Sequence, residues 1–381
     1  MKRKFLISNI QFPKNILEEE IIATLNYFFF FNYPPTLEEI HTFLKKKTSK
    51  RRLTSILEKM EKKSLIKVQK LDVRSEKLEE RTTNKKFTSS NLQLPTSNNL
   101  SRYTLHQYSN YPRVIPSEVE ESSEVTSDVA KRSNLAIQQF NHKPEQVRFT
   151  ASNFVKRYQI SINKLNSRKF RLYIKFLSFF PQIKLVGLSG SVAMLNAGED
   201  HDIDLFIITG KKRLWTGRLI ALLLAQILGI RRKRLNNNQQ LAINNKQLKN
   251  CVCLNLFFDE SNLKVLKFKQ TEYVAHEVLQ MKPLVQKDNI YLRFIDANRW
   301  VFDIFPNVRS GSTLISTQID ADSGNPRCHP RISASKRLFD LIEFLLKSFQ
   351  LYFINKHRSS EIITDSQLWF HPEDFAKKIK T

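Results

Sequence analysis

The chain has 381 residues, enough for two or more domains, and 41% of them are hydrophobic, which is typical of a globular protein. Its formal net charge of +26 favours a polyanionic partner, nucleic acid first and an anionic membrane surface second, although a merely solubilising charge fits the same composition. Three cysteines exclude a disulfide framework, no Cys/His spacing indicates a zinc site, and a reducing cytoplasm is therefore expected.

Residues 15–70 have the apolar spacing of three consecutive helices followed by a short strand. The pair Pro34-Pro35 ends the first helix, and Thr36 with Glu39 forms the Thr-x-x-Glu pattern of a capping box at the start of the second. The third helix, from about residue 49, has the i, i+3, i+4, i+7 spacing of one buried stripe. That stripe consists of Leu53, Ile56, Leu57 and Met60.

This succession of helices and a strand resembles a winged helix-turn-helix over the whole stretch. The resemblance implies that the third helix enters the DNA major groove, so its outer face would bind nucleic acid. The candidate contacts are Lys50, Arg51, Arg52, Ser55 and Lys59. Two alternatives stay open: many such modules bind only protein, and a small helical packing module would expose the same basic face to solvent.

Residues 71–140 are rich in Ser, Thr, Asn, Glu and Lys and lose the apolar periodicity. Such a stretch buries too little surface to offset the entropy of ordering, so we predict a disordered insert within or just after the wing. A second insert of this kind is expected near residues 311–335. The run from Val114 to Glu121 resembles a translated repeat element of some bacterial genes, which would make the first insert functionally inert.

The residues that carry chemistry lie in a predicted core over residues 145–262. Asp202 and Asp204 begin an apolar strand, and its two-residue period places both carboxylates on one face. Two unpaired carboxylates repel each other, and the pKa of one then rises unless a divalent cation binds between them. Mg²⁺ suits this position because it binds a few carboxylates together with substrate phosphate oxygens, and Mn²⁺ is the alternative.

Gly190-Ser191 follows a predicted strand over residues 184–188 and is expected to open a helix. Glycine lets the backbone approach a phosphate closely, while the helix N-terminus and the Ser191 hydroxyl donate hydrogen bonds to it. Phosphate donors beside metal-binding carboxylates predict a phosphoryl-transfer site. The alternative is a turn followed by a strand that starts with acidic residues.

Gly190-Ser191, ten intervening residues and Asp202-Ile203-Asp204-Leu205 resemble the DNA polymerase β-type nucleotidyltransferase superfamily, over roughly residues 183–260. The resemblance implies an α+β fold whose core has a small mixed sheet, followed here by a helical region over residues 263–381. It also implies that Asp202 and Asp204 bind two metal ions, that Gly190 and Ser191 hold the terminal phosphates of an NTP, and that pyrophosphate leaves.

The same family uses a third carboxylate on a neighbouring strand. The next predicted strand runs over residues 251–258, and Asn255 is the strongly polar residue on the face it shares with Cys251 and Cys253. Asn255 is therefore the candidate third metal ligand, although its amide brings no charge and cannot act as a base. Asp259 is the alternative if the strand ends early.

Three further segments receive weaker assignments. Lys211, after the Asp-x-Asp strand, is a candidate nucleotide contact, with a plain basic loop as the alternative. The longest apolar run, Leu219 to Ile230, is shorter than the about 20 residues that span a bilayer, so we predict a buried helix and no membrane partner. His276-Glu277 lacks a second histidine at metalloprotease spacing and is assigned to packing or surface.

Two functions follow from the sequence. The first is a metal-dependent nucleotidyltransferase that moves an NMP from an NTP to RNA, protein or a small molecule, the basic charge favouring a nucleic-acid acceptor. The second is a nucleic-acid-binding regulator with a degenerate, non-catalytic transferase fold. A folded carboxylate beside Asp202 and Asp204 favours the first, and Asn255 in that position favours the second. The sequence is silent on oligomeric state.

Overall fold

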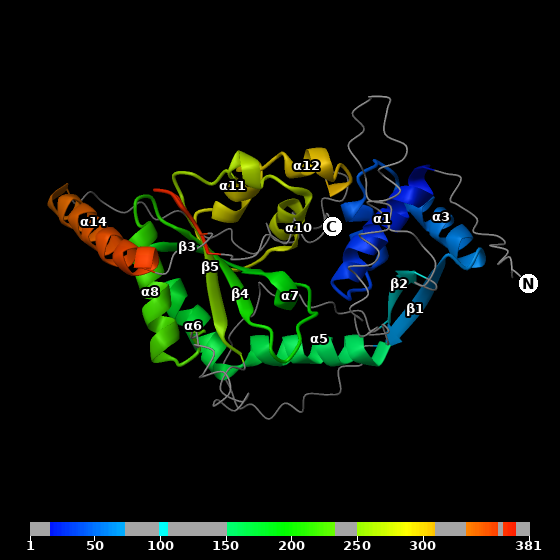
Figure 1. Ribbon diagram of the computed structural model, residues 1–381, viewed down its shortest axis with the longest axis horizontal. Helices are drawn as coiled ribbons and strands as arrows, with labels where there is room; N and C mark the ends of the chain where they lie inside the picture. Colours follow the sequence, from blue (N-terminus) through cyan, green and yellow to red (C-terminus); the bar gives the residue numbers. More distant parts are fainter. Residues whose placement is uncertain are drawn as a thin grey trace, which may run out of the picture.

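The computed structural model describes residues 16–72, 99–105, 151–232, 250–308, 333–356 and 361–370 (Figure 1). Helices surround two sheets, a two-stranded one in the N-terminal part and a six-stranded mixed one in the core. The prediction of an α+β chain with a small mixed sheet is confirmed at this level.

The N-terminal part follows the predicted succession of helices closely. Its elements are α1 (Ile16–Phe30), α2 (Leu37–Phe43), α3 (Lys50–Lys62), β1 (Ile66–Asp72) and β2 (Asn99–Leu105). Thr36 and Glu39 form the predicted capping box at α2, and the Ser49 hydroxyl caps α3. The predicted stripe of α3 is buried. The winged-helix assignment itself stays a prediction.

One strand corrects the prediction that residues 71–140 are a disordered insert. Residues 99–105 form β2, which pairs antiparallel with β1 in continuous register from Ile66 opposite Leu105 to Asp72 opposite Asn99. The strand was missed because its partner lies far away in the sequence, and a short strand inside a polar stretch leaves no local periodicity. The rest of that insert lies outside the described residues.

The six-stranded sheet has the order β6-β3-β4-β5-β8-β7. Its strands are β3 (Ile183–Ser189), β4 (Ile203–Thr209), β5 (Val252–Asp259), β6 (Lys282–Gln286), β7 (Ile362–Ile363) and β8 (Gln367–Trp369). Only β4 and β5 run parallel; the other neighbouring pairs are antiparallel. This mixed pairing puts the end of β3 beside the beginning of β4.

The prediction that residues 263–381 are helical is wrong in part, because β6, β7 and β8 come from this region. They satisfy backbone groups that β3 and β5 would otherwise present at open sheet edges. Strands of five, two and three residues are too short for a two-residue period to stand out. The helices of the region are α10 (Glu272–Gln280), α11 (Ile290–Ala297), α12 (Val301–Ile304) and α14 (Ser333–Lys356).

The sheet separates two hydrophobic cores. On one face, α5 (Ala151–Asn166), α6 (Arg168–Phe179) and α8 (Leu214–Ile227) cover Ile203, Leu205 and Ile207, which alternate with the aspartates and Phe206 along the chain. On the other face, Phe206 and Ile208 pack with α10, α11, α12 and residues of α1 (Figure 1). The alternation predicted for β4 is thus confirmed, and both of its faces are covered.

The apolar run from Leu219 to Ile230 forms most of α8, as predicted, but only one side of the helix is buried. Ala221 and Ala225 lie in the core, whereas Leu223 and Ile227 are exposed. Across the described parts of the chain, no helix combines the length and the apolar character needed to cross a membrane.

The N-terminal part docks against α10 and the segment after α12. The His276 ring stacks between Tyr27 and Phe43, with ring centroids 3.7 and 4.3 Å away. Nearby, the buried Asn307 side chain donates to Leu44 O and Lys46 O and accepts from the Thr48 backbone N–H, at 3.1, 2.9 and 2.8 Å. The N-terminal part and the core therefore share one packed interface.

We expect Asn307→Ala to lower the free energy of unfolding by about 2–3 kcal/mol, because three backbone groups of the loop before α3, one buried and two part-buried, lose their partners. Chemical denaturation measures the change. Asn355→Ala, at an exposed position of α14, is the matched control and should change stability by less than about 0.5 kcal/mol. Equal effects of both variants would contradict this account of the interface.

Candidate active site

The antiparallel pairing of β3 and β4 brings the two halves of the predicted motif together. Ser189 lies opposite Asp204, and Gly190 follows as the first residue of the short helix α7 (Gly190–Ala193). Gly190 has φ +64°, and a Cβ added there would lie 2.6 Å from Asp204 Oδ2. Glycine is therefore required at this position both by the backbone conformation and by the closeness of the carboxylate.

Ser191 contacts a histidine that the sequence did not single out. Its hydroxyl lies 3.0 Å from His201 Nδ1, and burial lowers the pKa of His201 below its ordinary value. Lys164 on α5 fixes the adjacent backbone, because its ammonium donates to Glu199 O and His201 O, each at 2.8 Å. A buried lysine thus holds the loop that leads into Asp202.

Asp202 forms an ion pair with Arg232, which lies five residues after the end of α8. Arg232 Nη1 donates to Asp202 Oδ2, and the Asp202 side chain is only 8% exposed. Burial raises the pKa of Asp202, and the Arg232 guanidinium opposes that rise. The sequence did not predict this ion pair.

Asp204 is the more strongly perturbed carboxyl. Burial, followed by the negative charges of Glu277 and Asp202, raises its pKa to about 7, while a hydrogen bond from Cys253 acts in the other direction. A charged Asp204 therefore lacks full compensation at neutral pH. This is the electrostatic condition in which a divalent cation would be stabilised.

Glu277 supplies a carboxylate that the sequence assigned to packing or surface. It lies on α10, accepts hydrogen bonds from the Gly190 backbone N–H and the Tyr273 hydroxyl, and has a pKa raised to about 6 by burial. His276 is buried, as a packing role requires, but the sequence did not predict the contact of Glu277 with Gly190. No local signal separates Glu277 from Glu272, the other acid of α10, because that contact joins residues far apart in the sequence.

Asn255, the candidate third metal ligand, is not the strand neighbour of Asp204, although its side chain is joined to that carboxyl through Cys253. The parallel register of β4 and β5 places Cys253 opposite Asp204. A β-bulge follows in β5, because Leu205 pairs with Leu254 but the next residue, Phe206, pairs with Leu256. Asn255 is the extra residue, and its side chain bonds to Cys253. The bulge itself could not be read from the alternation of residue types, and the metal-ligand role of Asn255 stays a prediction.

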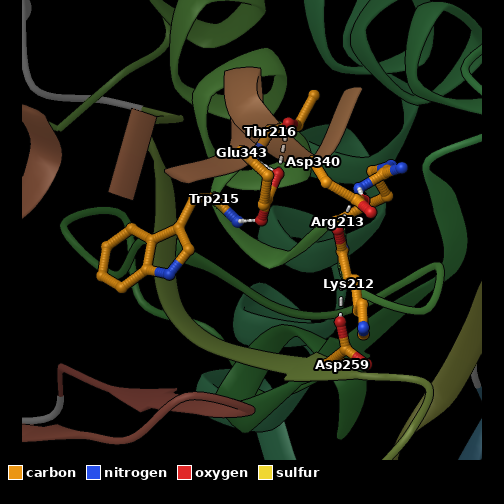
Figure 2. Close-up of polar contacts among 7 residues, drawn as sticks. All are labelled: Lys212, Arg213, Trp215, Thr216, Asp259, Asp340 and Glu343. Atoms are coloured by element: carbon orange, nitrogen blue, oxygen red, sulfur yellow. Dashed lines mark hydrogen bonds and ion pairs between the residues drawn. The ribbon is translucent and has the colours of Figure 1, made fainter. Parts of the chain in front are cut away.

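Lys211 and Asp259 lie at the opposite end of the sheet from Gly190. Lys211 comes two residues after the end of β4 at Thr209, and the strand from Asp204 to Thr209 alone spans about 17 Å at about 3.3 Å per residue. Asp259 ends β5 and accepts from the Arg213 backbone N–H at 3.3 Å (Figure 2). The nucleotide contact predicted for Lys211 and the ligand role considered for Asp259 are thus excluded by topology.

The basic residues predicted for α3 lie on its outer face. Arg51, Arg52 and Lys59 are exposed, and Lys50 forms an ion pair with Glu38. The nucleic-acid contacts expected of this face stay a prediction.

The donor set at Asp202 and Asp204 fits a hard cation of the Mg²⁺ type. Within the described residues, no group of three or more His, Cys, Asp and Glu side chains is arranged to hold a metal ion. Mg²⁺ is commonly bound through one or two carboxylates plus substrate phosphates, which is the arrangement that two aspartates beside Gly190-Ser191 can provide. The raised pKa of Asp204 supports the same choice.

No family model, curated protein or solved structure matches this chain in comparisons with known proteins. The chemistry of the site therefore has to be argued from its own residues.

We expect Gly190→Ala to destabilise the chain by roughly 1–3 kcal/mol, because the added methyl group meets Asp204 and strains a left-handed backbone. Gly210→Ala is the control, since the nearest atom to its added Cβ is 3.6 Å away, in ordinary contact. Denaturant unfolding compares the two variants. A Gly190→Ala variant as stable as Gly210→Ala would show that Asp204 is not held against the loop.

The pKa of Asp204 also has a consequence for stability. An ordinary aspartate has a pKa of 3.8, and the pKa of Asp204 in the folded chain is about 7. Between these two pH values the folded chain binds more protons than the unfolded chain, so its free energy of unfolding falls as the pH rises. We expect Asp204→Asn to be stabilised over the original chain, and more so at about pH 8 than at about pH 5. Thermal unfolding at both pH values tests this, and a pH-independent difference would contradict it.

Proposed function

We propose that this protein is a metal-dependent nucleotidyltransferase that moves an NMP from an NTP to an acceptor and releases pyrophosphate. The observation that carries the proposal is the meeting of Gly190-Ser191 with Asp204 at one end of the β3–β4 pair, with Glu277 as a further carboxylate bonded to Gly190. The negative charge of Glu277 acts on Asp204, and a carboxylate this near to Asp204 favours an active transferase over a degenerate one.

Asp202 and Asp204 would hold the cation. When bound, the cation supplies neutralisation of phosphate charge and orientation of the reacting groups. The Ser191 hydroxyl and the backbone of the Gly190 turn would donate to the terminal phosphates, while Glu277 holds that turn through the Gly190 N–H. Arg232 neutralises Asp202 here and would be released toward a phosphate when the nucleotide and cation arrive.

The reaction is a displacement at the α-phosphorus. An acceptor oxygen forms a bond to that phosphorus, the bond from the phosphorus to the bridging oxygen breaks, and pyrophosphate leaves with the bonding electrons. Glu277 is the candidate to take the acceptor proton, because a carboxylate with a pKa of about 6 is charged at neutral pH yet more basic than an ordinary glutamate.

The exposed basic face of α3 favours a second candidate, a nucleic-acid-binding regulator whose transferase site is silent. Arg51, Arg52 and Lys59 would then bind a phosphate backbone as their main role. The same face would instead dock a nucleic-acid acceptor if the site is active. The two candidates differ in whether labelled nucleotide is transferred.

The test incubates the purified chain with each NTP labelled at the α-phosphate, Mg²⁺ or Mn²⁺, and total bacterial RNA, and scores labelling of RNA and of the protein itself. We expect labelling that disappears in Asp202→Asn and Asp204→Asn and falls by about a hundredfold or more in Glu277→Gln. Lys211→Ala, at the far end of the sheet, is the matched control and should keep full activity.

Full labelling by Asp204→Asn would overturn the assignment of the site. No labelling by the original chain, together with RNA binding that drops in the Arg51→Ala/Arg52→Ala double variant, would instead establish the regulator. Comparable losses in Glu277→Gln and Lys211→Ala would show that Glu277 has no special part in transfer.

A further inference from the structure

Helix α14 is attached to the core by its polar side. Asp340 pairs with Arg213 at 2.9 Å, and the Glu343 carboxylate accepts from the backbone N–H groups of Trp215 and Thr216 at 2.6 and 3.0 Å (Figure 2). Further along, Gln350 donates to Trp215 O at 2.8 Å. The three residues of α14 are spaced by three and seven positions, about one and two helical turns, and so mark one side of the helix.

The attachment has a clear physical basis at the start of α8. Arg213 occupies the N-cap position without a side-chain cap bond, so the first backbone N–H groups of α8 need other acceptors. Glu343 provides them, and its negative charge is favoured at the positive end of the helix dipole. The polar side of α14 is thus fixed toward the protein, and the opposite side is fixed away from it.

That opposite side is apolar and exposed. Its large side chains are Leu338, Leu341, Ile342, Leu345, Phe349, Tyr352 and Phe353. The exposed fraction is 58% for Leu338 and 69% for Tyr352, so most of each side chain is in contact with solvent. Together they present several hundred square ångströms of apolar surface, which is unusual on a monomeric protein and approaches the ~800 Å² that each partner contributes to a standard interface.

The spacing within this surface indicates what covers it. Leu338, Ile342, Leu345, Phe349 and Tyr352 follow one another at intervals of four, three, four and three residues. A stripe with this alternation stays on one side of a helix along its whole length and fits against a second helix nearly parallel or antiparallel to it. We name these five residues the α14 stripe.

The charges of α14 favour a second copy of the chain over a membrane. Helices that lie on anionic lipid carry Lys and Arg along their polar side, which stays in contact with water and headgroups. In α14 the polar side is occupied by contacts to α8, and its Lys347 is paired with Asp365. From Leu338 to Tyr352 the stripe itself holds no charge, so an identical stripe is its natural complement.

We propose that the α14 stripe pairs with the α14 stripe of a second copy to form a two-fold symmetric dimer. The proposal does not depend on the transferase function, because the stripe lies on the side of α14 away from the sheet and contains no residue of the candidate site. Leu345, at the middle of the stripe, would lie near its own counterpart across the symmetry axis.

The test is the mass of the full chain by sedimentation equilibrium after nuclease treatment, at micromolar concentrations and above. We expect twice the monomer mass for the original chain and the monomer mass for Leu345→Glu. Phe344→Glu is the matched control, since Phe344 is equally exposed but lies off the stripe, and it should remain dimeric. Circular dichroism should show the same helix content in all three proteins, because neither residue is buried.

The salt dependence separates this dimer from association through a shared polyanion. Two copies that each carry +26 repel each other, so added salt should strengthen pairing of the stripes, whereas it would weaken association through residual nucleic acid. A monomeric original chain would overturn the proposal, as would an original chain that sediments like Leu345→Glu at every concentration. Loss of dimer in Phe344→Glu as well as in Leu345→Glu would overturn the assignment to the stripe.

Discussion

The candidate site depends above all on the antiparallel register of β3 and β4. Because Ser189 lies opposite Asp204, the turn at Gly190 comes within contact of a carboxylate that starts the next strand. A shift of one residue would turn Asp204 to the other face of the sheet, where Ile203 and Leu205 now pack in the core. Hydrophobic burial on both faces of β4 thus fixes the position of the acidic groups.

The carboxyl groups of the site are buried close to one another, so a bound cation would stabilise their negative charge. Burial and the repulsion of neighbouring carboxylates raise the pKa of Asp204, and burial raises the pKa of Glu277. The positive charge of Arg232 partly compensates Asp202. Such an arrangement weakens the fold at neutral pH, and a protein tolerates it where the charge serves binding or reaction. The hydrophobic cores on either side of the sheet supply the stability that offsets it.

Local patterns in the sequence were sufficient for much of the fold and for half of the site. The capping box at Thr36, the stripe of α3 and the alternation in β4 are all short-range features, and each was predicted correctly. The strands β2 and β6 and the carboxylate of Glu277 depend on partners far along the chain, which no local pattern encodes. A bulge and the direction of a strand decide the surroundings of Asn255 and Lys211, and residue types alone encode neither.

The stacking of His276 between Tyr27 and Phe43 has a consequence for where this protein divides into parts. Its neighbour Glu277 reaches the Gly190 turn, and Asn196, just after that turn, donates to Phe31 O at 2.9 Å. Glu277 and the Gly190 turn are therefore both positioned by contacts with α1 and the residues that follow it. A fragment that starts near residue 145 would contain every residue of the motif yet lack the surface that aligns them, so the smallest working unit is discontinuous in sequence and includes the N-terminal helices.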